Sequence, residues 1–293
     1  MSRADRALEV FRWKRILYDL KEAWKRFRKG KSSIMGLVIV SFIIGMSVFA
    51  PLIAPHEPDA LFYGDELKSP SAKFLMGTDR IGRDIFSYIV WGGRVSLFVA
   101  GGAVLIETII ALIIGGWAGY FGGLFDEIVM RFTDVIMTLP TIVILLVAVS
   151  MFRVRSIVLV TTIMGLLSWP WMTRIIRTQF LSLKEAPFVE AAKSMGASNI
   201  RIIFRYIFPN ALSPIIVIAT LDSAFFILYE ATLAFLGLVD PTAISWGVMV
   251  ATGKTVLRRA PWVTSFPSLM IFLTTLGFNL LGDGLRDYLD VKI

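Results

Sequence analysis

Long runs of apolar residues restrict the fold of this chain more than any other feature of its sequence. Six of them lie at residues 34–54, 97–120, 130–151, 157–172, 211–238 and 266–285. About 20 apolar residues are enough to cross the hydrocarbon core of a bilayer. Backbone polar groups find no partner in lipid, so such segments must satisfy them internally as helices. Charged residues make up only 18% of the chain, and we predict an all-α membrane protein with six transmembrane helices.

The lysines and arginines predict how these spans are oriented. They are concentrated before the first span and between the fourth and fifth spans, whereas the loop at 56–96 carries slightly more acid than base. Positively charged segments stay on the cytoplasmic side. We therefore expect both termini and residues 182–210 in the cytoplasm, an orientation that Arg153 and Arg155 oppose. The first apolar run is too long for the core of a signal peptide, so we expect it to be retained.

Residues 1–33 have a pattern of their own. Apolar side chains recur there at three- and four-residue steps, with lysines and arginines between them: Trp13, Ile16, Leu17, Leu20, Trp24 and Phe27. This spacing predicts an amphipathic helix that lies on the inner surface of the membrane. The alternative is a helix packed on another subunit.

The same composition excludes several classes of function. The net charge of +8 comes from residues that flank apolar runs, which does not indicate nucleic-acid binding. The chain has no cysteine and one histidine, His56, which we interpret as a polar loop residue and not as a metal ligand. Two Gly-Lys-Ser/Thr groups resemble part of a phosphate-binding loop, but Lys25 and Val248 stand where the upstream glycine is needed. We expect no nucleotide, cofactor or metal on this chain.

A polar stretch at residues 185–210 interrupts the apolar pattern. Pro187 suits the first turn of a helix, and Gly196 suits the left-handed residue that ends one. Ser198 is placed to cap a second short helix at 199–206, which we expect Pro209 to end.

One side of the first short helix has the character of a docking surface. We expect that side to carry Phe188, Ala191, Ala192 and Met195. The alanines allow close approach, the two larger side chains supply apolar contacts, and Glu190 offers a charge to a basic partner. The surrounding charges argue against the alternative, a hairpin packed in the core or re-entering the membrane.

Four acidic residues fall within the predicted spans. A charge at the bilayer centre costs about 2.5–3.5 kcal/mol on insertion scales, so such residues usually face a bundle interior or an aqueous path. Asp222 and Glu230 are spaced to face the same partner, and with Glu107 they are candidates for lining a pathway. Interhelical hydrogen bonds are the alternative role for all three. We expect Asp134 to pair with Arg131 in a structural role.

The segment after the first span contains a glycine-rich signature, "GTDRIGRD" at 77–84. Gly77 and Gly82 allow tight turns, Asp79 is placed to cap the following helix, and Arg83 with Asp84 is expected to form a local ion pair. On these residues alone, the signature is a self-capped loop that holds the second span.

Two motifs give the chain a resemblance to a known family. "EAAKSMG" followed by "FPN" resembles the EAA motif of binding-protein-dependent ABC importers. The matching residues are Glu190, Ala191, Ala192, Gly196 and Pro209, and the departures are Tyr206 and Phe208, which stay bulky. The 77–84 signature, "LYEATLAFLGL" and "NLLGDGLRDYLD" resemble the C-type permease subunit of the dipeptide/oligopeptide branch.

The resemblance implies a type I ABC importer transmembrane fold, in which the EAA loop at 182–210 holds a cytoplasmic coupling helix. It divides the chain into the interfacial helix at 1–33, the first span with its outer loop at 34–96, and a core of five spans at 97–293. It implies that the coupling helix docks on the ATPase through the side chains named above. It also implies that the binding protein meets Gly77, Thr78, Asp79, Gly82, Arg83 and Asp84.

The implied partners are a second homologous permease subunit as a heterodimer, two ATPase subunits that hold ATP and Mg, and an extracytoplasmic binding protein. The implied location is the inner membrane, and peptides are the implied cargo, with oligosaccharides, nickel complexes or glutathione-like compounds as alternatives. A different class, a secondary transporter driven by protons through the buried acids, would give the EAA-like loop no role.

Overall fold

A computed structural model describes residues 27–28, 30–152 and 155–290. Every regular element in these residues is a helix, and their one β-type contact is an isolated bridge between Thr78 and Asp84. The prediction of an all-α chain is therefore confirmed for the described part. The predicted interfacial helix at 1–33 lies almost wholly outside it.

Five helical segments are long and apolar enough to cross a membrane. They are α2 (Lys31–Val48), α4 (Ile85–Phe121), α7 (Ile157–Lys184), the continuous run of α9 and α10 (Asn199–Phe235), and α12 (Trp262–Asp290). A sixth crossing is possible through α5 (Gly123–Met137) and α6 (Thr141–Ser150), which meet at an 85° bend. The third predicted span is thus a broken pair of helices, with Pro140 at the start of α6.

Several helices are longer than the apolar runs that predicted them. The second span begins at Ile85 and not at 97, because the Asp84 side chain accepts a hydrogen bond from the Ser87 N–H and caps the helix there. The fourth continues past residue 172 to Lys184. Hydropathy marks the part of a helix inside lipid, whereas capping groups decide where the helix begins and ends.

Pro209 does not end the second short helix, contrary to the prediction. A single helical run passes from α9 (Asn199–Ile202) through a π-helical turn at Ile203–Ile207 into α10 (Phe208–Phe235), and Pro209 lies in the first turn of α10. A π-turn shifts the pattern of backbone hydrogen bonds by one residue. This turn ends at Ile207, just before Pro209, whose nitrogen has no hydrogen to donate.

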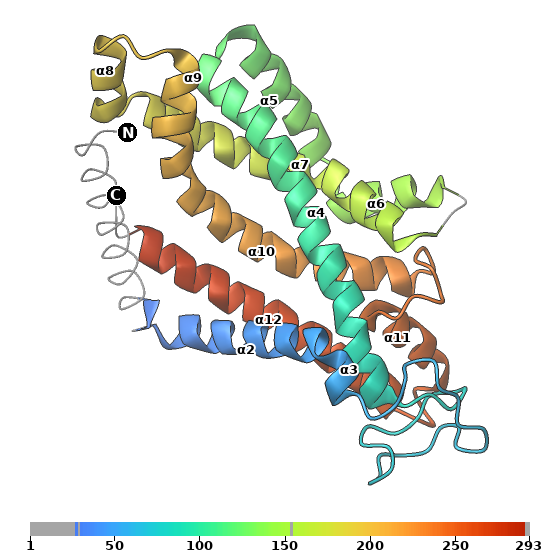
Figure 1. Cartoon of the computed structure of the whole chain (residues 1–293). Coiled ribbons are helices and arrows are strands. Elements are labelled where there is room, and N and C mark those ends of the chain that lie inside the picture. Colours follow the sequence, from blue (N-terminus) through green and yellow to red (C-terminus); the bar gives the residue numbers. More distant parts are fainter. Residues whose placement is uncertain (1–26, 29, 153–154, 291–293) are drawn as a thin grey trace, which may run out of the picture.

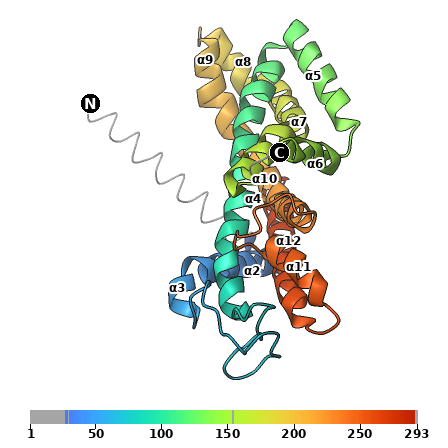
Figure 2. The same cartoon turned by 90° about the vertical axis from the view of Figure 1, so that its right-hand side faces the viewer.

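Figure 1 shows the helices as a bundle with two differently built ends. The short helix α8 (Pro187–Ser194) lies at one end, and residues 54–84, which we call the outer loop, lie at the other. Figure 2 shows the same separation after a quarter turn. The helix α11 (Trp246–Gly253) lies toward the end that carries the outer loop, and α3 (Ala50–Ile53) leads into that loop.

Glycines allow the longest helices to touch along their backbones. A Cβ on Gly115 of α4 would lie 2.6 Å from the Thr173 carbonyl oxygen of α7, and one on Gly119 would lie 2.5 Å from that of Arg177. Likewise, a Cβ on Gly36 of α2 would lie 2.5 Å from the Leu281 backbone nitrogen of α12. Such close approach, and not the exclusion of water, is what holds helices together in lipid.

A single added methyl group tests the contact between α4 and α7. Gly115→Ala is expected to lower stability by about 1–3 kcal/mol, the usual range for overpacking. Gly101→Ala, in the same helix, is the matched control because nothing lies within 4 Å of the added Cβ. Thermal unfolding of the detergent-solubilised protein should show a lower Tm for Gly115→Ala only. Equal Tm values for the two variants would contradict the close contact.

Candidate functional site

The short helix α8 begins and ends as its sequence predicts. Pro187 occupies its first turn, and Gly196 follows its last with φ +78°. The Gly196 N–H donates to the Lys193 carbonyl at 2.9 Å, and the Ala197 N–H donates to the Ala192 carbonyl at 3.1 Å. This pair of bonds is a Schellman motif, which fixes the direction of the chain as it leaves a helix.

The two faces of α8 differ from the predicted arrangement. Ala192 is fully buried and packs beside Val189, a residue that the sequence analysis did not select. Their spacing of three residues was the available signal. Phe188 and Met195 are 42% and 76% exposed, and Ala191 is exposed with them. The exposed face therefore keeps three of the four predicted members, and Ala192 belongs to the face that holds α8 in place.

Polar contacts between helices fix the platform beneath α8. The Arg177 guanidinium of α7 donates to both carboxylate oxygens of Asp126 in α5, at 2.5 and 2.6 Å. The Tyr120 hydroxyl of α4 donates to the Asn199 side-chain oxygen of α9 at 2.8 Å. A two-pronged arginine–carboxylate pair restricts orientation as well as distance. These bonds join α7 to α5 and α4 to α9 at this end of the bundle.

The predicted pairing of Asp134 with Arg131 is wrong. Asp134 accepts from Arg174 of α7, and Arg131 donates to Glu127, one turn earlier in α5, at 2.7 Å. The prediction chose Arg131 because it is close to Asp134 in the sequence. In the structure, the packing of α5 on α7 brings Arg174 to Asp134.

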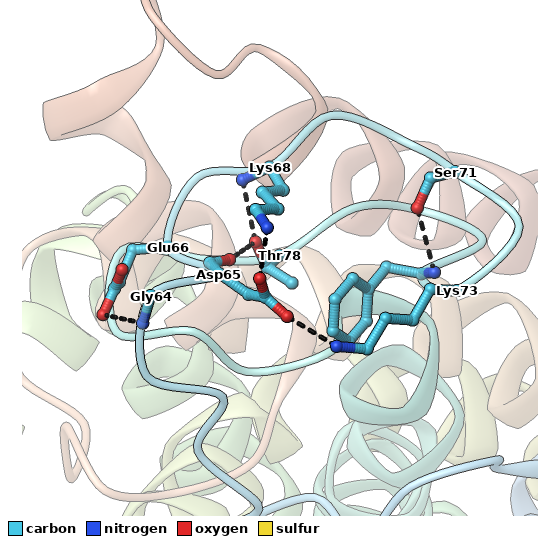
Figure 3. Close-up of polar contacts among 8 residues, drawn as sticks. Gly64, Asp65, Glu66, Lys68, Ser71, Lys73 and Thr78 are labelled. Carbon is cyan, nitrogen blue, oxygen red and sulfur yellow. Dashed lines mark hydrogen bonds and ion pairs between the residues drawn. The ribbon is translucent and has the colours of Figure 1, made fainter.

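The outer loop is held together by its own polar groups, as Figure 3 shows. Asp65 accepts from the ammonium groups of Lys68 and Lys73, the latter at 2.6 Å. The Thr78 hydroxyl donates to the Asp65 carbonyl and accepts from the Lys68 N–H at 2.9 Å. Glu66 accepts from the Gly64 N–H at 3.1 Å. These contacts close the loop on itself, and the Trp262 indole N–H of α12 adds a hydrogen bond to the Thr78 carbonyl at 3.3 Å.

The signature at 77–84 is self-capped, but through other pairs than predicted. Gly77 and Gly82 have φ values of +77° and +85°, as tight turns require. Asp79 does not cap the helix; its carboxylate accepts from the Arg83 backbone N–H and pairs with the Arg83 side chain at 2.8 Å. The helix cap is Asp84, which also contacts the His56 Nδ1 at 3.2 Å. The predicted Arg83–Asp84 ion pair is therefore wrong.

The three buried acids fall into two groups. Glu230 of α10 is fully buried, and its Oε1 accepts from the Ser245 hydroxyl at 2.6 Å. Ser245 in turn caps α11, so Glu230 joins α10 to α11. Glu107 of α4 and Asp222 of α10 are 2% and 9% exposed, and the two helices pack against each other. Each of the three carboxyl groups keeps one oxygen without a hydrogen-bond partner among the described residues.

Comparison with known proteins finds two family matches along the chain. The family described as "binding-protein-dependent transport system inner membrane component" matches residues 111–293, and the "N-terminal TM domain of oligopeptide transport permease C" matches residues 20–70. The chain is 38% identical over 278 residues to the dipeptide transport system permease protein DppC of Alkalihalophilus pseudofirmus, covering 93% of this chain and 90% of that protein.

Two further relatives cover as much of the chain. It is 39% identical to the oligopeptide transport system permease protein OppC of Bacillus subtilis, over 96% of this chain and 92% of that protein. It is 37% identical to the glutathione transport system permease protein GsiD of Pectobacterium atrosepticum, over 98% of this chain and 95% of that protein.

Removing the Asp65 carboxylate tests how the outer loop is held. The lysine ammonium groups lower the pKa of Asp65 below its usual 3.8, with the Lys68 hydrogen bond as the largest cause. The ionised Asp65 carboxylate therefore stabilises the loop fully above pH 3.8, and this stabilisation is lost as the pH falls through the lowered pKa. Asp65→Asn should speed hydrogen exchange of backbone amides at 62–79 several-fold at pH 7.

Asp59→Asn is the control, since Asp59 is exposed in the same loop and has no ion pair in the described structure. The global Tm should barely change, because exposed ion pairs contribute little to global stability. Exchange that is unchanged in Asp65→Asn would show that the loop is held by other contacts.

Proposed function

This chain belongs to the family of binding-protein-dependent transport system inner membrane components, and we propose that it forms half of the translocation path of an ATP-driven peptide importer. The relatives named for dipeptides, oligopeptides and glutathione support a peptide cargo over the oligosaccharides or nickel complexes that the family resemblance left open. The other half of the path is a second, homologous permease subunit. The chain is not the catalytic subunit, and ATP and Mg are held by two partner ATPases.

The proposed architecture is the type I importer fold in the inner membrane, with six spans if α5 and α6 together make one crossing. Both termini and α8 are cytoplasmic, and the outer loop faces the binding protein. The charge distribution supports this orientation, because Arg201 and Arg205 of the α8–α10 connection are exposed and positive segments stay inside.

The exposed face of α8 carries the proposal. Phe188, Ala191 and Met195 present apolar surface away from the bundle, and Glu190 is exposed without an ion-pair partner in the described structure. Exposed apolar side chains on a rigid support are typical of interaction sites. We assign this face to a cleft of the ATPase subunit, with α8 as the coupling helix.

The buried face of α8 explains how movement would be transmitted. Val189 and Ala192 pack against Ile202 and Ile207, which belong to the run that continues into α10. When ATP binding closes the two ATPases, α8 moves with its cleft and carries the inner ends of α7 and α10. The bundle then tilts, the path opens toward the loaded binding protein, and hydrolysis reverses the change.

A proton-driven secondary transporter is the competing class. The observation in its favour is that one buried carboxyl oxygen on each of Glu107 and Asp222 lacks a hydrogen-bond partner among the described residues. In the importer these two acids line the path, whereas Glu230 fixes α11. The competing class predicts uptake by the purified chain alone in proteoliposomes with a pH gradient. The importer requires ATP and the partner subunits.

Truncating the exposed face of α8 tests the coupling role. In the assembled importer, Phe188→Ala with Met195→Ala should lower ATP hydrolysis stimulated by the binding protein about tenfold or more. Apolar anchors at interfaces often contribute about 1–2 kcal/mol or more each. Stimulated hydrolysis in proteoliposomes is the measurement.

The matched control is Met151→Ala with Phe152→Ala, which removes the same two side-chain types from an exposed site beyond α6. This control should keep normal stimulation. Equal activity of the two double variants would refute the assignment of α8 to the ATPase.

A further inference from the structure

A basic groove of about 630 Å³ lies between the outer loop and the turn that follows α11. Four of its lining side chains are cationic: Arg80, Lys254, Arg258 and Arg259. Leu67 and Leu257 are among the apolar lining residues. Two segments far apart in the chain thus line the same groove. We call the groove formed around these six residues the basic groove.

The positive charge of the basic groove is not neutralised within the described structure. Arg80, Arg258 and Arg259 are exposed, and none of them forms an ion pair with another described residue. The Lys254 ammonium donates to the Phe235 carbonyl at 3.2 Å and lies 4.4 Å from the centre of its ring, neither of which cancels its charge.

Three acids that lie near the groove residues in sequence have other partners. Asp65 is shared by two lysines, and Asp79 pairs with Arg83. Asp240 accepts from the backbone and side chain of Thr242. Asp65 and Asp79 are therefore engaged by other cations, and Arg80 forms no ion pair with a described residue. An anionic group from outside the chain is the missing complement.

The position of the basic groove favours a water-soluble partner. The outer loop extends past the ends of α2 and α4 in Figure 1, and its exposed ion pairs indicate that it faces water and not acyl chains. Guanidinium groups bind carboxylates in a two-pronged geometry that a flexible ammonium does not match. Three arginines in one groove therefore suit a surface that bears several Asp or Glu side chains.

We propose that the basic groove receives an acidic surface of the extracytoplasmic binding protein during docking. This inference rests on the proposed function and adds the chemistry of the contact. Exposed complementary charges act mainly on association rate and salt dependence. The basic groove should therefore determine the concentration of binding protein that half-saturates ATP hydrolysis. It should not change the maximal rate of hydrolysis by the docked complex.

The test is charge reversal in the assembled importer, reconstituted with its own purified binding protein. Arg258→Glu with Arg259→Glu should raise the concentration of binding protein that half-saturates ATP hydrolysis about tenfold or more. The maximal rate should stay unchanged. The salt dependence of half-saturation should also become weaker. Arg258→Lys with Arg259→Lys keeps the charge and is the matched control, expected to shift half-saturation much less.

Two results would overturn the proposal. One is half-saturation by the binding protein that does not change on charge reversal. The other is an effect of reversal on basal hydrolysis that appears only in vesicles containing phosphatidylglycerol and not in phosphatidylcholine alone, which would assign the groove to lipid headgroups. Failure of the proposed function is distinguishable, because then no concentration of binding protein stimulates the wild-type complex.

Discussion

The close contact of α4 with α7 is the constraint on which the rest of the structure depends. Gly115 and Gly119 admit the backbone of α7, and Gly165 of α7 admits α4, where a Cβ would lie 2.8 Å from the Ala103 carbonyl oxygen. The outer loop leads into α4, and α7 leads into α8. A contact that locks these two helices over much of their length therefore connects the two ends of the molecule.

Hydrogen bonds and ion pairs between side chains add to this packing, because they fix how neighbouring helices are oriented. Arg177 with Asp126 and Tyr120 with Asn199 fix the platform of α8, and Asp84 fixes the start of α4. Inside the bundle, Glu230 positions Ser245, and the adjacent Trp246 donates its indole N–H to the Ile89 carbonyl at 2.9 Å. Buried polar groups without such partners are costly, so each of these bonds also selects one arrangement of its helices.

Hydropathy alone located the five helices that are long and apolar enough to cross a membrane, because lipid demands apolar helices whatever they pack against. It failed where other forces act. Asp84 starts α4 before the apolar run, and a π-turn carries the chain past Pro209. The ends of α8 were predictable because proline favours the first turn of a helix and glycine favours the left-handed position that ends one. Pro187 and Gly196 occupy these two positions. The burial of Ala192 was signalled only by its spacing of three residues from Val189. The pairing of Asp134 with Arg174 depends on a neighbour 40 residues along the chain, which local spacing cannot supply.

The two proposed docking surfaces differ in kind, and the difference matches what each partner must do. The α8 face is apolar at Phe188 and Met195, and buried apolar anchors act chiefly by slowing dissociation. A motor that drives every cycle gains from such a contact because it stays bound. The basic groove offers exposed charge, which speeds encounter without prolonging the bound state. A carrier that must dock, deliver its peptide and leave requires that second kind of surface, so in the proposed orientation the apolar contact lies inside and the charge outside.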